Sequence, residues 1–320
     1  MTVSRKIRVG VIGVGYLGRL HAEKYAAIDG AELVGVADLD TARAGEIAAA
    51  HGTRAVGSYR DFIGSVDAVS VVTPTQSHCP IALEFLSRGV DVLVEKPIAL
   101  DTAEADSLVA EAKRTGAVLQ VGHLERFNAA ISALEGKVQD PRLMDARRVS
   151  PFPNRSTDVD VVLDVMIHDI DIVLHLAASE VVAVEASGLP VVTDMPDVAS
   201  ARLVFANGCV ANITASRVAK DKQRKLDIYT GNAVIGVDFA SQQLCISRPV
   251  ERAGAAFKEL ADDELNVTKR DSLLEELKSF ISCSAAGSTP PVTGTDGRDA
   301  LHVAQMIQDS IRLNAGRAAR

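Results

Sequence analysis

The sequence contains a lysine and an aspartate–histidine pair whose chemistry suits the oxidation of an alcohol. Lys96 closely follows a short apolar run, Val90–Val94, and precedes Pro97. Asp164 and His168 are four residues apart, so on a helix they lie on one face. An imidazole, with a pKa near about 6.5, can accept a proton at neutral pH. We interpret His168 as a general base, Lys96 as the group that holds the substrate oxygen, and Asp164 as a group that orients the imidazole or binds a neighbouring hydroxyl.

Each of these residues also has a structural alternative. Lysines commonly lie on exposed loops, and an aspartate–histidine pair can cap a turn or be satisfied in a core. We prefer the catalytic interpretation of Lys96 because it stands at the carboxyl end of a central strand, where the ligand crevice of a parallel sheet opens. Asp171, three residues after His168, is interpreted as structural, pairing or capping within the same helix.

A glycine-rich turn near the start of the chain predicts a dinucleotide site. Gly13-Val14-Gly15-Tyr16-Leu17-Gly18 follows the strand-like run Val9–Ile12 and opens an amphipathic helix. Gly13 would make the tight turn, Gly15 would let the backbone approach a pyrophosphate, and Gly18 would let the helix pack closely on the strand. The helix N-terminus would then offer unpaired N–H groups and a positive dipole end to the phosphates.

An acidic residue follows at the distance that such a turn requires. Asp38 ends the second strand-like run, which reads Val34-Gly35-Val36-Ala37. A carboxylate here accepts hydrogen bonds from the adenosine ribose and repels a 2′-phosphate, so the sequence favours NAD over NADP. Arg43, about a turn further on, could soften that preference.

The elements that position these residues alternate between strand and helix over residues 1–122. The expected strands are Ile7–Ile12, Leu33–Ala37, Ala68–Val72, Val90–Val94 and Val118–Val121, and the expected helices are Gly18–Ile28, Thr41–His51, Cys79–Arg88 and Ala103–Thr115. Short runs rich in Val and Ile are typical of buried parallel strands. The alternation predicts right-handed crossovers and an α/β, doubly wound Rossmann domain.

Residues 123–320 have a different pattern and are expected to form an α+β domain with an open, mainly antiparallel sheet. A helical stretch, Asp158–Leu176, precedes the strand-like segments Val181–Gly188, Ala199–Phe205, Cys209–Ser216, Leu226–Tyr229, Ala233–Phe239 and Leu244–Ser247. Asn207-Gly208 and Gly231-Asn232 predict tight hairpins, because these residues tolerate positive φ. The last helices, near Arg270–Cys283 and Arg298–Leu313, are expected to pack back towards the Rossmann domain.

Composition and charge restrict the partners. The net charge of −8 disfavours nucleic acid and anionic membranes. No apolar run reaches the roughly 18 residues of a membrane span, and the first residues lack the apolar core of a signal peptide. The four cysteines are far apart, without metal-ligand spacing. We expect a cytoplasmic protein without a metal.

One face of the open sheet must be wet or paired, and pairing between copies would give a homodimer or homotetramer.

Several motifs, in this order, resemble the glucose–fructose oxidoreductase / inositol dehydrogenase / MocA (Gfo/Idh/MocA) family. They are Gly18-Arg19-Leu20-His21, Thr73-Pro74-Thr75-Gln76-Ser77-His78, Glu95-Lys96-Pro97, Gly122-His123-Leu124-Glu125-Arg126-Phe127-Asn128, Asp164-Val165-Met166-Ile167-His168-Asp169-Ile170-Asp171 and Asp296-Gly297-Arg298-Asp299-Ala300-Leu301. The resemblance covers nearly the whole chain. It implies a Rossmann domain, a second domain with an open antiparallel sheet, a tightly held nicotinamide cofactor, and sugar or cyclitol substrates.

The motifs and the resemblance together give the expected site. Contacts to NAD are expected from Gly13, Gly15, Tyr16, Leu17, Gly18, Asp38, Thr73, Pro74, His78, Glu95 and Lys96. Contacts to substrate are expected from Lys96, Arg126, Asn128, Arg155, Asp164 and His168, with Lys96, Asp164 and His168 as the catalytic residues. For His78 a role at a helix start is equally open, and for Arg126 and Asn128 the alternative is hydrogen bonding at the domain boundary.

Within the family, two stretches are similar to bacterial UDP-N-acetylglucosamine 3-dehydrogenases. They are His123–Asn128 and Arg155–Asp164, although Ala129 stands where that type commonly has proline. The similarity implies oxidation of the sugar 3-hydroxyl by NAD, to a ketone that a partner aminotransferase converts to an amine. A diphosphate needs cations, which Arg155 and the basic run Arg217–Lys225 could supply, although such a run is by default a solvated face.

Two other functions stay open at this point. A free cyclitol or monosaccharide could be the substrate, and its binding would not depend on Arg155 or on the basic run. A hypothesis of a different class is a non-catalytic, NAD-sensing regulator on the same fold. The presence of Lys96, Asp164 and His168 argues against that regulator.

Overall fold

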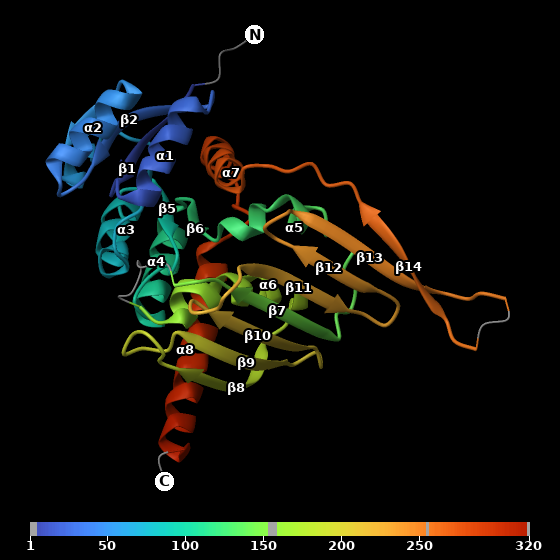
Figure 1. Ribbon diagram of the computed structural model, residues 1–320. Helices are drawn as coiled ribbons and strands as arrows, with labels where there is room; N and C mark the ends of the chain where they lie inside the picture. The colour runs from blue at the N-terminus through green and yellow to red at the C-terminus, as the bar shows by residue number, and fades with distance from the viewer. Residues whose placement is uncertain (1–4, 153–158, 254–255, 319–320) are drawn as a thin grey trace. The chain divides into compact units, whose positions relative to one another are not determined.

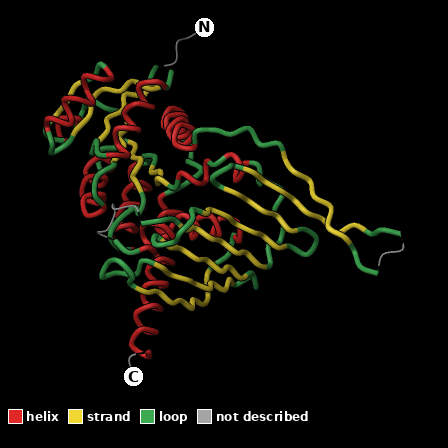
Figure 2. The backbone as a smooth tube through the Cα atoms, viewed as in Figure 1, coloured by secondary structure: helices red, strands yellow, loops and turns green. Residues whose placement is uncertain are grey.

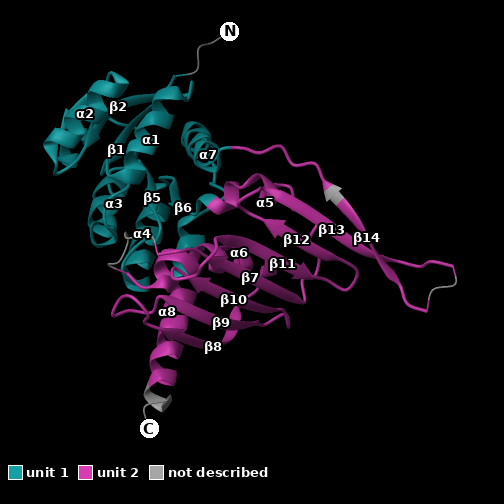
Figure 3. Cartoon of the chain, viewed as in Figure 1, with its two compact units in different colours: residues 1–124, 271–301 teal, residues 125–270, 302–320 magenta. Residues whose placement is uncertain are grey.

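The chain contains two sheets, each in its own compact unit (Figures 1 and 2). The structure, a computed structural model, describes residues 5–152, 159–253 and 256–318. The first unit contains the residues up to Leu124 together with Asp271–Leu301, and the second contains Glu125–Arg270 and the residues from His302 onward (Figure 3). The boundary expected after residue 122 therefore lies two residues later, and the expected second domain loses Asp271–Leu301 to the first unit.

A six-stranded parallel sheet forms the centre of the first unit. Its strands are β1 (Ile7–Ile12), β2 (Ala31–Ala37), β3 (Arg54–Val56), β4 (Ala68–Val71), β5 (Asp91–Glu95) and β6 (Leu119–Gly122). They lie in the order β3-β2-β1-β4-β5-β6, and all pairs are parallel. The order reverses between β1 and β4, where doubly wound sheets bind ligands at the carboxyl ends of the strands. The expected Rossmann fold is confirmed, with β3 as a strand that the sequence did not indicate.

Three helices of the first unit begin at a capping aspartate and end at a glycine. They are α1 (Tyr16–Ala27), α2 (Thr41–His51), α3 (His78–Leu86), α4 (Thr102–Thr115) and α7 (Ser272–Ala286), with short 3₁₀ turns η1 (Tyr59–Phe62) and η2 (Thr75–Ser77). The carboxylate of Asp271 caps α7, and Gly287, with φ 59°, ends it. Leu277 and Phe280 of α7 are buried in one core with Val9 and Tyr25. This burial explains why α7 belongs to the first unit.

An eight-stranded open sheet forms the second unit. Its strands are β7 (Leu143–Val149), β8 (Val181–Leu189), β9 (Val198–Phe205), β10 (Val210–Ser216), β11 (Gln223–Tyr229), β12 (Val234–Asp238), β13 (Gln243–Val250) and β14 (Glu259–Leu265). Their order is β14-β13-β12-β11-β7-β10-β9-β8, and every pair is antiparallel except β7–β10. The mainly antiparallel open sheet is confirmed. Its parallel pair arises because β7, which the sequence analysis did not identify, lies between β10 and β11.

Helical segments of this unit include one π-helical turn that the sequence did not indicate. The segments are η3 (Leu124–Phe127), which starts at the unit boundary, α5 (Ala129–Ser132), the π turn η4 (Val162–Met166), α6 (Ile167–Ala177) and the later part of α8 (Gly294–Ala318). Helix α6 packs against β7 and β10. Along β11, Leu226 and Ile228 are buried while Lys225 and Asp227 are exposed, so the two faces of the sheet differ. In the ranges described, no helix is long and apolar enough to cross a membrane.

Candidate active site

The turn between β1 and α1 has the shape that close approach of a phosphate requires. A Cβ on Gly18 would lie 1.9 Å from the carbonyl oxygen of Gly13, so only glycine allows α1 to pack this closely. A Cβ on Gly15 would instead meet no atom within 4 Å, so the missing side chain leaves open space at the helix start. Helix α1 begins at Tyr16 without a side-chain cap and without an acidic residue in its first turn. Its N–H groups can therefore receive an anion, which fits the pyrophosphate of NAD.

Two other members of the turn, Tyr16 and Leu17, have different surroundings. The ring of Tyr16 is 63% exposed, and the guanidinium of Arg19 lies 5.2 Å from its centroid. Leu17 is partly buried and packs against the core of the first unit. Tyr16 therefore presents its side chain to solvent, whereas Leu17 is turned towards the core.

The acidic residue after β2 lies beside this turn. The carboxylate of Asp38 accepts the backbone N–H of Val14 at 2.8 Å and that of Asp40 at 2.9 Å. The guanidinium of Arg43 lies 2.9 Å from the carboxylate of Asp40 and 3.6 Å from that of Asp38. The charge of Arg43 is thus balanced by the carboxylates of Asp38 and Asp40. The negative charge of Asp38 is suited to a ribose with free hydroxyls. This arrangement fits NAD better than NADP.

The ends of β4 and β5 lie at the same edge of the parallel sheet as the turn. Thr73 and Pro74 follow β4, and the Thr73 hydroxyl accepts a hydrogen bond from Ser77 at 2.8 Å. His78 is buried, with its two ring nitrogens 2.7 Å from the carbonyl oxygen of Thr73 and 2.9 Å from that of Pro97. Burial lowers the pKa of His78, although both carbonyl contacts oppose the shift. His78 therefore ties the two loops together, which is its structural alternative at a helix start.

Glu95 is turned into the protein at the end of β5. One carboxylate oxygen lies 3.2 Å from Nε2 of His21, and the other accepts the backbone N–H of Lys96 at 3.2 Å. Nδ1 of His21 lies 3.4 Å from the hydroxyl of Ser70. Glu95, expected as a contact to NAD, is thus a buried residue that holds the backbone of Lys96. The sequence analysis missed the supporting role of His21, whose signal was its place three residues after Gly18.

In the second unit, Asp164 and His168 flank the junction of the π turn and α6. Asp164 lies within Val162–Met166 and His168 in the first turn of α6, and both are partly exposed. The carboxylate of Asp160 starts this segment by accepting the N–H groups of Val162 and Leu163 at 3.0 and 3.1 Å. Single π turns inside helices occur frequently at functional sites. The two residues are about one turn apart, as the expected spacing required.

A buried ionic cluster includes Asp169, the residue that follows His168. Its centre is Arg148 of β7, which donates to both carboxylate oxygens of Asp169 and, at 2.6 Å, to Glu125. Burial lowers the pKa of Arg148, but Asp169 and Glu125 outweigh it, and the net shift is upward. The sequence analysis missed Arg148 because its two partners are distant in the chain.

Asn128 belongs to the same cluster. Its amide donates to Glu125 at 3.1 Å and to the carbonyl oxygen of Phe239 at 3.0 Å. Its side-chain oxygen accepts the N–H of Ala130 at 3.1 Å and so caps α5. The side chain is 2% exposed. The structure therefore gives Asn128 internal hydrogen-bond partners, and its contact to substrate stays a prediction.

The remaining expected substrate residues differ in their placement. Arg126 lies 3.2 Å from Asp171, and these side chains are 8% and 2% exposed. Asp171 thus pairs with a residue of η3. Arg217, the first cation of the basic run, is fully buried and donates to Asp197 at 2.8 Å. Arg155 lies outside the described residues.

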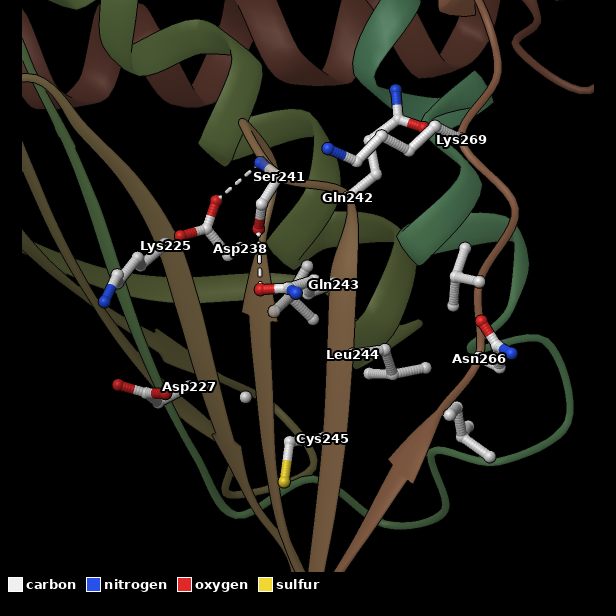
Figure 4. A pocket seen from close by; sticks show the side chains of 14 residues that line it. Lys225, Asp227, Asp238, Ser241, Gln242, Gln243, Leu244, Cys245, Asn266 and Lys269 are labelled. Carbon is white, nitrogen blue, oxygen red and sulfur yellow. Dashed lines mark hydrogen bonds between the residues drawn. The ribbon is translucent and has the colours of Figure 1, made fainter.

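A pocket of about 640 Å³ lies elsewhere in the second unit (Figure 4). Lys225, Asp227, Asp238, Gln243 and Cys245 are among its lining residues. Apart from Lys225, which belongs to the basic run Arg217–Lys225, none of the lining residues is among the expected site residues. Within the described ranges, no group of three or more His, Cys, Asp or Glu residues could hold a metal ion.

Comparisons with known proteins match each of the two units to a family model. Residues 7–123 match the model "Oxidoreductase family, NAD-binding Rossmann fold", and residues 130–235 match the "GFO/IDH/MocA C-terminal domain". A UDP-N-acetylglucosamine 3-dehydrogenase of Acidithiobacillus ferrooxidans is 40% identical over 306 residues, which are 95% of this chain and 97% of that protein. A solved structure of that enzyme gives a TM-score of 0.91 and covers 96% of this chain and 97% of its own.

More distant relatives include enzymes of other names. An inositol 2-dehydrogenase of Rubrobacter xylanophilus is 30% identical over 328 residues, 98% of this chain and 93% of that protein. A levoglucosan dehydrogenase solved with NADH and levoglucosan gives a TM-score of 0.85 at 18% identity, covering 96% of this chain and 98% of that one. The similarity to the levoglucosan dehydrogenase concerns the fold alone.

Proposed function

Because the chain belongs to the Gfo/Idh/MocA family of NAD-binding oxidoreductases, we propose that it oxidises the C3 hydroxyl of UDP-N-acetylglucosamine with NAD, giving the 3-keto sugar. The observation that carries this proposal is the 40% identity, over 95% of the chain, to a UDP-N-acetylglucosamine 3-dehydrogenase. That identity extends through both units. The open space at Gly15 and the carboxylate of Asp38 support NAD as the cofactor.

The chemistry divides among three residues. Bound NAD would supply the acceptor for the hydride of the carbinol carbon. Lys96, whose backbone is held by Glu95, binds the substrate oxygen and stabilises the negative charge that develops on it. His168 takes the hydroxyl proton, and Asp164, on the preceding turn, orients the imidazole or binds a neighbouring hydroxyl. The π turn supports this assignment because it contains Asp164 and ends two residues before His168, the proposed base.

The same proposal includes an assembly and a cellular location. The face of the second unit's sheet away from α6 pairs with its copy, giving a homodimer or homotetramer. Lys225 and Asp227 alternate on this face, and charges of both signs support self-complementary pairing. The substrate partner is a small molecule, with no nucleic acid or membrane involved. The protein acts in the cytoplasm, where its four free cysteines stay reduced.

A second candidate substrate is a free cyclitol. The 30% identity to an inositol 2-dehydrogenase, over 98% of the chain, favours this class. The test is NADH formation by the purified protein with NAD and, separately, UDP-N-acetylglucosamine, N-acetylglucosamine or myo-inositol. Glutamate and the partner aminotransferase remove the keto product and pull the equilibrium.

Turnover should be fastest with the nucleotide sugar and should be lost in His168→Ala. Turnover with myo-inositol alone would keep the family and reject the nucleotide sugar. If NAD binds tightly and no polyol is oxidised, the regulator becomes the better explanation.

A further inference from the structure

The fold separates the basic run Arg217–Lys225 into different environments. Arg217 is fully buried against Asp197. Lys225 is exposed and stands opposite Asp238 in the pairing of β11 with β12. Arg224, the residue before it, therefore projects from the other face of β11, and its side chain is 41% exposed.

The strand register shows which face Arg224 occupies. Strand β11 pairs antiparallel with β7, and Arg224 stands directly opposite Arg148. Residues directly opposite in an antiparallel pair project from the same face. Arg148 reaches Asp169 of α6, so Arg224 lies on the α6 face of the sheet. Asp169 follows His168 directly, which places Arg224 on the face that carries the proposed base.

The charge of Arg224 is only weakly matched by its neighbours. Its guanidinium lies 3.6 Å from the carboxylate of Glu125, which already accepts hydrogen bonds from Arg148 at 2.6 Å and Asn128 at 3.1 Å. Across the described ranges, this ion pair is the one polar contact of the Arg224 guanidinium. Burial and the positive charge of Arg148 lower the pKa of Arg224, while the carboxylates of Glu125 and Asp169 raise it, and the net shift is downward. A bound anion would offset that repulsion.

We propose that Arg224 binds the diphosphate of the nucleotide sugar and thereby selects a nucleoside diphosphate sugar over a free sugar. This inference rests on the proposed function and deepens it. A planar guanidinium with five N–H donors can hold phosphate oxygens in a bidentate fork. The diphosphate is attached at C1 of the same ring whose C3 hydroxyl meets the base. A cation on the sheet face that carries the helix of His168, as Arg224 does, is therefore suited to the diphosphate of such a substrate.

The test compares Arg224→Gln and Arg224→Lys with a control, Lys137→Gln. The control removes a like charge from an exposed residue of the same unit that lies outside the basic run. For each full-length, NAD-loaded protein we would measure kcat and KM for UDP-N-acetylglucosamine, kcat/KM for free N-acetylglucosamine, and the Kd of UDP by calorimetry. Thermal unfolding and molecular mass would show whether each variant keeps its fold and assembly.

For Arg224→Gln we expect KM for the nucleotide sugar and the Kd of UDP to rise roughly tenfold to a hundredfold, since a charge-assisted hydrogen bond is lost. Activity on free N-acetylglucosamine should not change, because that sugar has no phosphate. Arg224→Lys should be intermediate, because an ammonium keeps the charge without the fork. Lys137→Gln should match the wild type.

Two results would overturn the inference. If the wild type oxidises UDP-N-acetylglucosamine and Arg224→Gln has the same KM, the proposed function stands and the role of Arg224 is rejected. If Arg224→Gln lowers activity on the free and the nucleotide sugar equally, the residue serves only the buried cluster. A wild type that binds UDP through Arg224 but does not oxidise UDP-N-acetylglucosamine would reject the proposed function and keep the anion site.

Discussion

Arg148 and Asp169 form a bidentate ion pair inside the second unit. Nε of Arg148 lies 3.1 Å from both carboxylate oxygens, and Nη2 lies 2.8 Å from one of them. The two side chains are 5% and 2% exposed. Because Asp169 follows His168 in the first turn of α6, this pair ties the helix of the proposed base to β7.

Arg148→Ala should destabilise the protein by about 3–5 kcal/mol at neutral pH, because it leaves buried carboxylates without their cation. Burial raises the pKa of Asp169, and without Arg148 that pKa rises further. The deficit should therefore shrink as the pH falls and the carboxyl becomes neutral. Urea unfolding across pH measures this change. The control, Arg142→Ala, breaks an exposed pair with Asp140 and should cost roughly 0–1 kcal/mol. A deficit that does not vary with pH would contradict the account.

The pKa of Asp197 is shifted downward, whereas that of Asp169 is shifted upward. Burial raises its pKa, but the backbone N–H groups of Val191, Val192 and Thr193, together with Arg217, lower it well below its usual range. An acid with a lowered folded-state pKa contributes stability above its unfolded pKa of about 3.9, and loses it as the pH falls towards the folded value.

Asp197→Asn should therefore cost about 3–5 kcal/mol at neutral pH, with a deficit that begins to shrink only below about pH 4. Urea unfolding of both proteins, from neutral pH downward, gives the two curves. If the free energies of unfolding of the two proteins differed by the same amount at every pH, the ionised carboxylate would not contribute to stability.

Alanine substitutions of the glycines in the phosphate turn should separate effects on NAD affinity from effects on stability. Gly15→Ala adds a Cβ that meets no protein atom within 4 Å, so stability should hold while NAD affinity falls roughly tenfold or more. Gly18→Ala places a Cβ 1.9 Å from the Gly13 carbonyl oxygen, so this variant should lose both stability and NAD affinity. Gly45→Ala, within α2 and also without a close contact, should stabilise by about 0.5–1 kcal/mol and leave NAD binding alone. Calorimetric titration with NAD and thermal unfolding test all three. Unchanged NAD affinity in Gly15→Ala would reject the turn as the phosphate site.

Cofactor choice should depend on Asp38 more than on its neighbour. Asp38→Ser removes the charge that repels a 2′-phosphate and leaves Arg43 with Asp40 alone, so the NADP-to-NAD ratio of kcat/KM should rise roughly tenfold or more. Asp40→Ser keeps Asp38 and a capping hydroxyl, and should change the ratio less. An equal change in both variants would assign the preference to Arg43.

Local features of the site were predictable, and those that depend on distant partners were not. The turn Gly13–Gly18 and its acid Asp38 follow from spacing within one β–α–β segment. Strand β7 was missed because Leu143–Val149 contains Asp145, Arg147 and Arg148, which is an unusual composition for a central strand. Arg148 can be buried there only because Glu125 and Asp169 meet it.

The same reason explains why the structural contacts of two expected site residues could not be read from the sequence. Asn128 has the polarity of a substrate contact, but the carbonyl oxygen of Phe239, 111 residues away, takes one of its hydrogen bonds. His78 likewise meets Pro97, 19 residues further on. Lys96, Asp164 and His168 were named from their chemistry and their order in the chain, and their catalytic roles stay predictions.

The position of oxidation is tested most directly with UDP-N-acetylglucosamine that carries deuterium at C3. The protein, NAD and the labelled sugar would be incubated with the partner aminotransferase and glutamate, and the NADH formed would be analysed by mass spectrometry. The account predicts deuterium in the NADH, and none when the label is at C4. NADH that forms from the C3-labelled sugar without deuterium would show that another carbon is oxidised, and would contradict the proposed function.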